Sequence, residues 1–346
     1  MKVALDGTPL IVSTGGIPRY ASELSLALRQ TFPEDEFFLL TDQPVLHEAC
    51  LPPGPLNPFE RRWWSIGLPR RLAQLSVDVF HGTDYAVPYI PLRPAVLSLH
   101  DLSPWLNPGW HNAAGRVRRR APYLMGLGLA TLVMTPTEAV RRGAIDLFGL
   151  SPSRVVAVPY AAPSWMRPSP QQPPPRPYFL YVGTLEPRKN IPVILEAWRH
   201  VRRVRDVDLV LAGRRREDFP PLDPEPGLIL RGTVPDSELP PLYSNCVACL
   251  YPSLYEGFGL PVLEAMQCGA AVVTSRDPAV REVAGDAALY AGDGDWPQAL
   301  TALLDQPELL SRLREQSLRR AALFSWHGTA IATRQVYALA MSGLHT

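Results

Sequence analysis

The sequence predicts an α/β protein with two doubly wound domains that face one another, each built on a parallel sheet. Three observations support this fold class. At 346 residues the chain exceeds the size at which a single hydrophobic core usually stops growing. Short apolar runs alternate with helical patterns, which is typical of parallel sheets covered on both faces. A proline-rich break divides these elements into two series.

The first series predicts an N-terminal Rossmann-like domain over residues 1–162. Its strand-like runs are Val3–Leu5, Phe37–Leu40, Val77–Phe80, Val96–Leu99, Thr131–Met134 and Val155–Val158. Its helical patterns are Tyr20–Leu28, Arg116–Leu129 and Glu138–Phe148. The break that follows, residues 163–177, contains seven prolines and almost no apolar periodicity. Such a composition favours extended backbone, so we expect a semi-rigid linker there.

The second series predicts a C-terminal Rossmann-like domain over residues 178–325. Its strand-like runs are Tyr178–Val182, Val207–Ala212, Leu228–Leu230, Val247–Tyr251, Ala271–Thr274 and Ala287–Tyr290. Helical patterns lie at Ile191–Arg203, Ser237–Ser244, Leu260–Cys268 and Trp296–Leu304. Two more, Pro307–Leu323 and Thr329–Leu344, follow without a strand between them. A terminal helix over residues 326–346 could therefore cross back to the N-terminal domain.

Composition excludes several classes of partner. The formal net charge is +1, so no global field would attract nucleic acid. We find no apolar stretch of transmembrane length, and the N-terminus reads as a strand and a turn rather than a signal peptide. Cys246 and Cys249 form one C-x-x-C without the second pair that a zinc site needs, so we expect buried structural thiols. These observations predict a cytoplasmic protein.

The loop after the strand Tyr178–Val182 carries a first candidate site. Gly183 and Thr184 make the turn, and Arg188 and Lys189 stand just before the next helix. Open α/β sheets bind ligands at the carboxyl ends of their strands, where Arg and Lys bind phosphate oxygens. Lys189 is one of only two lysines in a chain that otherwise uses arginine. A solvated basic loop is the alternative, and for either interpretation we expect both side chains to be exposed.

A second candidate site lies in residues 253–266, Ser-Leu-Tyr-Glu-Gly-Phe-Gly-Leu-Pro-Val-Leu-Glu-Ala-Met. Gly257 and Gly259 remove side chains at the turn, so the backbone near Phe258 and Leu260 can approach an anion at a helix N-terminus. A carboxylate beside a phosphate is repulsive. We therefore expect Glu256 to bind the hydroxyls of a sugar and Glu264 those of a ribose. An ordinary strand–turn–helix joint is the alternative.

Together these two motifs resemble glycosyltransferase family 4, a large group of retaining enzymes with the GT-B fold. The resemblance rests on Gly-Thr-x-x-x-Arg-Lys-Asn and, about seventy residues later, Glu-Gly-Phe-Gly-Leu-Pro-x-Leu-Glu-Ala. It implies that Arg188 and Lys189 bind the donor diphosphate and that Glu256 and Glu264 form the family's paired-glutamate element. The domain order and the linker position agree with the family along the whole chain.

The N-terminal half carries weaker signals. The resemblance implies that the loop at Gly15 and Gly16 closes over the donor, although a Gly-Gly pair read alone is only a flexible turn. It also implies that His100, at the end of a predicted strand, contacts the transferred sugar near the reacting carbon; a capping histidine is the alternative. Asp101 and the segment His81-Gly-Thr-Asp84, which ends another predicted strand, could line an acceptor cleft, although we favour a structural or modest acceptor role for that segment.

By this resemblance, the acceptor attacks on the face from which the diphosphate leaves, and the diphosphate takes up the acceptor proton. His100 could stabilise the developing positive charge through its backbone carbonyl. We expect no cofactor and no metal site, because no Asp-x-Asp is seen that would hold a divalent metal. The partners would be a nucleotide-diphosphate sugar, with a lean toward GDP-mannose, and a glycan or lipid-linked acceptor in polysaccharide biosynthesis.

Three alternatives remain open for the function. A phosphorylase or epimerase on the same fold would keep the diphosphate site, and a non-catalytic nucleotide-sugar binder would keep the fold. A dinucleotide-dependent oxidoreductase would need Gly-x-Gly-x-x-Gly after the first strand, and the segment from Gly7 to Gly16 does not provide it. Basic, partly aromatic residues in Arg61–Arg71 and Arg116–Arg120 could contact the inner face of a membrane. Oligomeric state is not predicted.

Overall fold

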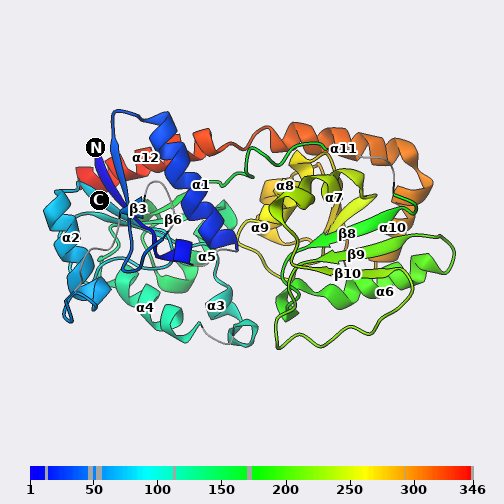
Figure 1. Ribbon diagram of the computed structural model, residues 1–346, viewed down its shortest axis with the longest axis horizontal. Coiled ribbons are helices and arrows are strands. Elements are labelled where there is room, and N and C mark those ends of the chain that lie inside the picture. The colour runs from blue at the N-terminus through cyan, green and yellow to red at the C-terminus, as the bar shows by residue number, and fades with distance from the viewer. Residues whose placement is uncertain are drawn as a thin grey trace. The chain divides into compact units, whose positions relative to one another are not determined.

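The computed structural model describes residues 1–11, 15–45, 50–51, 57–111, 114–169, 174–292 and 294–343 (Figure 1). They form two compact units. The first unit comprises Met1–Tyr160 with Ser325–Thr346, and the second comprises Ala161–Phe324. Each unit is a parallel sheet with helices, so the predicted α/β class with two doubly wound domains is confirmed.

The sheet of the first unit has seven parallel strands in the order β3-β2-β1-β4-β5-β6-β7. The strands are β1 (Lys2–Asp6), β2 (Glu36–Leu40), β3 (Cys50–Leu51), β4 (Val79–Gly82), β5 (Ala95–Ser98), β6 (Leu132–Thr135) and β7 (Val155–Ala157). The sequence predicts six of them. It misses β3 because a strand of two residues is too short to show a period.

The helices of the first unit are α1 (Gly16–Thr31), α2 (Leu68–Leu75), α3 (Ser103–Leu106), α4 (Gly115–Gly126), α5 (Glu138–Phe148) and α12 (Trp326–Ser342), with short turns η1 (Thr8–Ile11), η2 (Trp63–Gly67), η3 (Pro108–Trp110) and η4 (Pro152–Arg154). Among these helices, α1 is longer than its predicted pattern, α4 ends earlier and α5 matches its prediction. The buried stripe of α1 includes Tyr20, Leu24 and Leu28, the spacing of one helix face.

The terminal helix α12 belongs to the first unit and runs beside α1 (Figure 1). Its side chains complete a buried aromatic cluster, in which Trp326 stacks on Tyr160 at 6.4 Å between ring centroids. Arg334 forms an ion pair of 2.6 Å with Asp35. These contacts join residues from opposite ends of the chain, so the first unit is closed only when its last helix is in place.

The second unit is a six-stranded parallel sheet in the order β10-β9-β8-β11-β12-β13. The strands are β8 (Tyr178–Val182), β9 (Asp208–Ala212), β10 (Leu228–Gly232), β11 (Ala248–Tyr251), β12 (Ala271–Thr274) and β13 (Leu289–Tyr290). The helices are α6 (Ile191–Arg202), α7 (Leu239–Asn245), α8 (Leu260–Gln267), α9 (Pro278–Ala284), α10 (Trp296–Asp305) and α11 (Pro307–Ala321), with short turns η5 (Pro187–Lys189) and η6 (Asp236–Glu238). Helix α6 packs with α10, whereas α8 packs with α7, α9 and α11.

The C-x-x-C of this unit belongs to no group of three His, Cys, Asp or Glu side chains that could hold a metal ion among the described residues. Cys246 and Cys249 are free, fully buried thiols around the start of β11. Burial raises the pKa of Cys246 to about 12, which keeps the thiol protonated and unreactive. The prediction of buried structural thiols is confirmed.

In both sheets the strand order reverses at one place. In the first unit this switch point lies between β1 and β4, and in the second it lies between β8 and β11. Loops on the two sides of a switch point lead to helices on opposite faces, which leaves a crevice at the carboxyl ends of the strands. The two switch points therefore show where each unit can bind a ligand.

Close packing of two backbones fixes the strand ends beside the second switch point. Gly213, at the end of β9, has φ +147°, and a Cβ there would lie 1.9 Å from the carbonyl oxygen of Gly183. Gly183 itself has φ +148° and follows β8. Only glycine fits this approach, because a side chain would force the two loops apart.

Gly213→Ala should therefore destabilise the protein by about 3 kcal/mol or more, the sum of backbone strain and overpacking. Gly232→Ala is the matched control, since Gly232 also has a positive φ of +60° but nothing within 4 Å of its added Cβ. It should cost about 1 kcal/mol. Thermal unfolding midpoints measure both, and equal losses would show that the contact with Gly183 does not constrain the loop.

Candidate functional site

The loop after β8 places two cations at the second switch point. After the turn at Gly183 and Thr184, the chain pairs once more with the segment that follows β9, through a parallel bridge between Leu185 and Arg215. The chain then forms the short turn η5, and Asn190 enters α6 with a left-handed φ of 50°. This backbone path fixes Arg188 and Lys189 on a tight turn rather than on a mobile loop.

Lys189 is buried, and its ammonium group donates hydrogen bonds to two side chains. Its Nζ donates to Glu256 Oε1 at 2.5 Å and to the hydroxyl of Tyr251 at 2.9 Å. It also lies over the Tyr251 ring, 5.0 Å from the centroid. Burial lowers the pKa of Lys189, and the charge of Glu256 opposes that effect. Tyr251 ends β11, so the ammonium group bridges the two strands of the switch point.

Arg188 extends the same network. It donates to Glu256 Oε2 at 3.2 Å, to the carbonyl of Tyr255 at 2.8 Å and to Glu186 Oε1 at 3.0 Å. Glu186 in turn accepts from Arg216 at 2.7 Å. A carboxylate oxygen thus meets every one of these cations, so an anion that binds here would compete with those carboxylates for the same N–H donors.

The side chain of Glu256 is the anion at the centre of the network. Burial raises its pKa, but Lys189 and Arg188 outweigh that effect and lower the pKa to about 2, so the carboxylate stays ionised. Its backbone N–H donates to Asp277 Oδ2 at 3.2 Å, while Asp277 Oδ1 caps α9 at the N–H of Val280, 3.0 Å away. Asp277 therefore positions the loop that carries Glu256.

One expectation about these residues is wrong. Arg188 and Lys189 are not exposed: their side chains are 12% and 10% accessible, because both ion pairs lie against the ends of β8 and β11. Glu256 forms ion pairs with both cations, and its role toward the hydroxyls of a sugar stays a prediction.

The rest of the second motif forms the start of α8. Gly259 caps the helix with φ 89°, and Phe258 is buried edge-on against Phe324 at 6.0 Å. Leu260 is the first helical residue, and Gly257 precedes Phe258 in the turn. Glu264 lies one turn into α8, is 3% exposed and accepts a hydrogen bond from Tyr243 at 3.3 Å. A ribose role for Glu264 stays a prediction.

In the first unit, both ring nitrogens of His100 have partners. Nε2 lies 2.7 Å from the carbonyl of Thr83, which can only accept, so Nε2 carries a proton. Nδ1 lies 2.7 Å from the hydroxyl of Tyr160. Burial lowers the pKa of His100, against the opposing charges of Asp84 and Asp101, which favours a neutral ring. The ring is held rigidly, and its role toward a sugar stays a prediction.

His81 is fully buried, and the structure gives it structural partners. Nδ1 lies 2.7 Å from the hydroxyl of Tyr337 on α12, and Nε2 lies 2.8 Å from Ser98 on β5. A contact between His81 and an acceptor does not fit this burial. Asp101 is half-buried, and its Oδ1 accepts from the N–H and the hydroxyl of Ser103 at 2.9 and 2.7 Å. It therefore caps α3.

The Gly-Gly pair lies at the beginning of α1. Gly15 is exposed with φ 129°, and Gly16 is the first residue of the helix. The helix thus starts four residues earlier than predicted. Part of the predicted loop, residues 12–14, lies outside the described residues.

Two family models match successive parts of the chain. Residues 14–162 match the family model described as Glycosyltransferase Family 4, and residues 176–306 match Glycosyl transferases group 1. The chain is 36% identical to O-antigen chain mannosyltransferase B of Escherichia coli over 87% of its own length and 82% of that protein. The chain belongs to glycosyltransferase family 4.

Other relatives and solved structures agree with this assignment. The glycosyltransferase is 30% identical to the MMP alpha-(1->4)-mannosyltransferase of Mycolicibacterium hassiacum, over 66% of this chain and 56% of that protein. Sucrose-phosphate synthase from Thermosynechococcus elongatus superposes with a TM-score of 0.75 at 18% identity, covering 99% of both chains. HepE of Anabaena, solved with UDP and glucose, gives 0.71 at 15% identity, covering 98% of this chain and 100% of that one. The GT-B fold is confirmed.

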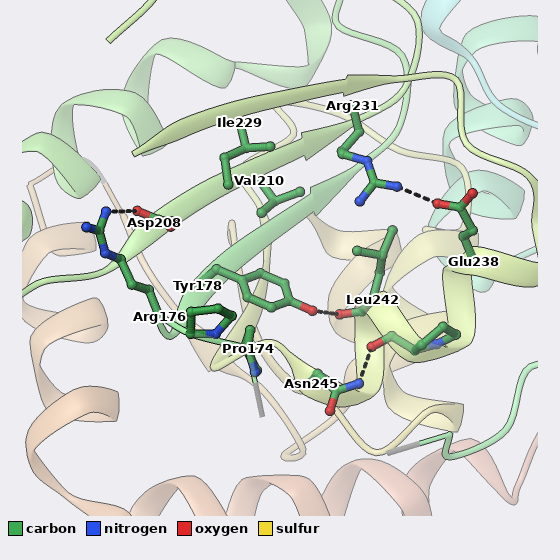
Figure 2. A pocket seen from close by; sticks show the side chains of 12 residues that line it. Pro174, Arg176, Tyr178, Asp208, Val210, Ile229, Arg231, Glu238, Leu242 and Asn245 are labelled. Carbon is green, nitrogen blue, oxygen red and sulfur yellow. Dashed lines mark hydrogen bonds and ion pairs between the residues drawn. The ribbon is translucent and has the colours of Figure 1, made fainter. Parts of the chain in front are cut away.

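A separate cavity of about 750 Å³ lies on the sheet of the second unit (Figure 2). Its floor includes Tyr178, Val210 and Ile229, and an ion pair between Arg231 and Glu238 lies at its edge. Tyr178 begins β8, and none of the cations at the end of that strand lines this cavity. The cavity is therefore distinct from the candidate site of the glycosyltransferase.

The predictions about a metal and about membrane contact are not tested by the structure. Within the described ranges, no three His, Cys, Asp or Glu side chains are grouped to hold a metal ion, and no helix is long and apolar enough to cross a membrane. Arg116, Arg119 and Tyr123 on α4, and Leu127 directly after it, are exposed at helical spacing. Arg61, Arg62 and Arg70 are also exposed. Contact with a membrane surface stays a prediction.

Sequence reasoning missed four residues of the network of ion pairs and hydrogen bonds around Lys189 and Glu256. Glu186 and Arg216 complete the chain of ion pairs, Tyr251 holds Lys189, and Asp277 holds Glu256. Only Glu186 has a local signal, since it stands two residues before Arg188. The others come from different strand ends, which only the sheet brings together.

Glu256→Gln should destabilise the enzyme by about 3–5 kcal/mol near neutral pH, because it leaves Lys189 as a buried charge without its counter-ion. The pKa of Glu256 is depressed from an ordinary 4.5 to about 2. Its stabilising effect is therefore fully present above about pH 4.5 and is lost as the pH falls toward 2. Unfolding measured across this range should show the gap between wild type and variant closing in acid.

The same substitution should raise the affinity for inorganic pyrophosphate at least tenfold, since the competing internal anion is gone. Calorimetric titration at neutral pH measures this. Glu238→Gln is the control, because it removes an exposed partner of Arg231, with side chains 41% and 43% accessible. Unchanged or weaker pyrophosphate binding in Glu256→Gln would show that Glu256 and the phosphate do not compete for the same cations.

Proposed function

We propose that this enzyme is a retaining mannosyltransferase that transfers mannose from GDP-mannose to a glycan or lipid-linked acceptor in polysaccharide biosynthesis. The observation that carries the proposal is the pair Arg188 and Lys189, held at the second switch point by carboxylates that a diphosphate can replace. The 36% identity with an O-antigen chain mannosyltransferase supports the choice of sugar and acceptor class.

The chemistry follows from the charge at this site. In the transfer, the acceptor oxygen forms a bond to the anomeric carbon while the bond from that carbon to the diphosphate oxygen breaks. The leaving diphosphate gains negative charge and takes up the proton of the acceptor hydroxyl. Arg188 offers a fork of N–H donors and Lys189 a point charge, both fixed in advance on η5. Preorganised donors of this kind stabilise the transition state more than the ground state.

Glu256 has a second task in this proposal. When the diphosphate occupies the cations, the carboxylate is released from them, and its backbone stays anchored to Asp277. The freed carboxylate can then accept hydrogen bonds from the hydroxyls of the donor sugar. Since a buried group that binds hydroxyls rejects analogues lacking them, Glu256 would select the sugar.

Titration of the purified enzyme with UDP-, GDP- and ADP-sugars tests the donor, and we expect GDP-mannose to bind most tightly and to support transfer. Lys189→Met should lower kcat/KM about 10²–10³-fold, the range for loss of one preorganised donor. Arg199→Ala, which removes an exposed partner of Glu225, is the control. NMR of the product should show the anomeric configuration of the donor. An inverted product, or full activity of Lys189→Met, would exclude the proposed mechanism.

Transfer should not need a divalent metal, because Arg188 and Lys189 supply the positive charge that stabilises the leaving diphosphate. Activity measured with excess EDTA should match that of the untreated enzyme. The same assay with added Mg²⁺ or Mn²⁺ is the control. Loss of activity with EDTA that either ion restores would mean that a metal contributes to the leaving-group site.

A further inference from the structure

Tyr251, the last residue of β11, is the uncharged partner of Lys189. Its hydroxyl lies 2.9 Å from Nζ of Lys189. An ammonium group has donors only, so the hydroxyl accepts this hydrogen bond. The ammonium also lies 5.0 Å from the centroid of the Tyr251 ring. Lys189 is therefore held by a neutral side chain as well as by the carboxylate of Glu256.

Two neighbouring strands fix Tyr251 in place. The side chain is 1% exposed, and its ring stacks on that of Tyr181 in β8, with 6.5 Å between the centroids. Its backbone carbonyl accepts from the hydroxyl of Thr274 at 3.0 Å and from the N–H of Ser275 at 3.1 Å, at the end of β12. None of these contacts involves the ion pair. The position of the Tyr251 hydroxyl is thus set independently of the charges that surround Lys189.

The two partners of Lys189 differ in what they do to its charge. The carboxylate of Glu256 neutralises the ammonium and competes with any other anion for its N–H donors. Burial raises the pKa of Tyr251 well above its ordinary value, so the hydroxyl is uncharged. A neutral acceptor orients the ammonium and leaves its positive charge available to a ligand.

We propose that Tyr251 is a positioning residue for the transfer, whose hydroxyl keeps Lys189 directed at the diphosphate once Glu256 has released it. This inference rests on the proposed function, in which the diphosphate replaces that carboxylate. Lysine has a flexible side chain, and ordering it costs conformational entropy. A hydroxyl fixed by the sheet lowers that cost, because the ammonium stays oriented while its anionic partner changes.

The effect of this positioning should grow as the glycosidic bond breaks. The leaving diphosphate carries more negative charge than the diphosphate of the intact donor, so a well-placed ammonium stabilises it more. Loss of the Tyr251 hydroxyl should therefore weaken the binding of free pyrophosphate and slow the transfer. It should affect the binding of the intact donor less.

A double-mutant cycle tests whether Tyr251 acts through Lys189. Tyr251→Phe removes the hydroxyl and keeps the ring that stacks on Tyr181. Tyr178→Phe is the matched control, because this buried tyrosine also loses one hydrogen bond, to the carbonyl of Leu242 at 2.8 Å, at the other end of β8. Both are made in the wild type and in Lys189→Met. Calorimetry measures the affinity for inorganic pyrophosphate, kinetics give kcat and KM with GDP-mannose, and thermal unfolding verifies that each variant folds.

Tyr251→Phe should lower the pyrophosphate affinity and kcat about tenfold each, the effect of one hydrogen bond to a charged group, with the donor KM within about threefold of wild type. Tyr178→Phe should change none of these values. In Lys189→Met, Tyr251→Phe should change the pyrophosphate affinity less than about twofold, because the group through which the hydroxyl acts is gone.

An equal loss of pyrophosphate affinity in both backgrounds would overturn the proposal, since it would show a structural effect that does not pass through Lys189. Wild-type pyrophosphate affinity in Tyr251→Phe would overturn it as well. Pyrophosphate binding does not depend on the donor sugar, so a wrong choice of GDP-mannose leaves both results readable. Unchanged affinity in Lys189→Met itself would remove the phosphate site of the proposed function, and this inference with it.

Discussion

The buried ion pair between Lys189 and Glu256 joins the two halves of the second sheet. Lys189 follows β8 and Glu256 follows β11, so a single contact of 2.5 Å spans the place where the strand order reverses. Tyr251 and Arg188 extend this contact to both strand ends, and Asp277 connects it to α9. The loops that would bind a donor are therefore ordered by electrostatic contacts before any ligand arrives.

This arrangement has an energetic consequence. A buried ion pair contributes little net stability, since desolvation of both charges offsets most of the attraction between them. Its value lies instead in position: the carboxylate holds two cations at the carboxyl ends of the strands, where open α/β sheets bind ligands. A site with unpaired buried cations would be less stable, and a site with exposed cations would be screened by salt. The internal carboxylate avoids both outcomes.

The buried polar network of the first unit consists of uncharged side chains, whereas that of the second unit contains ion pairs. Tyr20, Ser98, His81 and Tyr337 form a buried chain of hydrogen bonds from α1 through the sheet to α12. Burial lowers the pKa of His81 to about 3, so it stays uncharged at neutral pH. Such a network fixes the terminal helix against the sheet without placing a charge in the core.

Much of this architecture was readable in the sequence because it depends on short-range patterns. Alternating apolar runs and helical patterns predict the parallel sheets, and the turn residues Gly183, Gly257 and Gly259 predict where each strand ends. The spacing of Arg188, Lys189, Glu256 and Glu264 carries the family resemblance. Each of these signals is contained in a segment of about a dozen residues, or in the order in which such segments follow one another along the chain.

The tertiary structure decided which of these groups touch, which are buried and which carry a charge. Lys189 and Glu256 are 67 residues apart in the chain, and His81 and Tyr337 are 256 apart. Their contacts follow from strand order and from the return of α12, which no local pattern specifies. Burial of Lys189 and His81 likewise depends on neighbouring layers. The sequence by itself determined the fold class and the position of the donor motifs, whereas packing between distant segments determined the pairing and ionisation of their side chains.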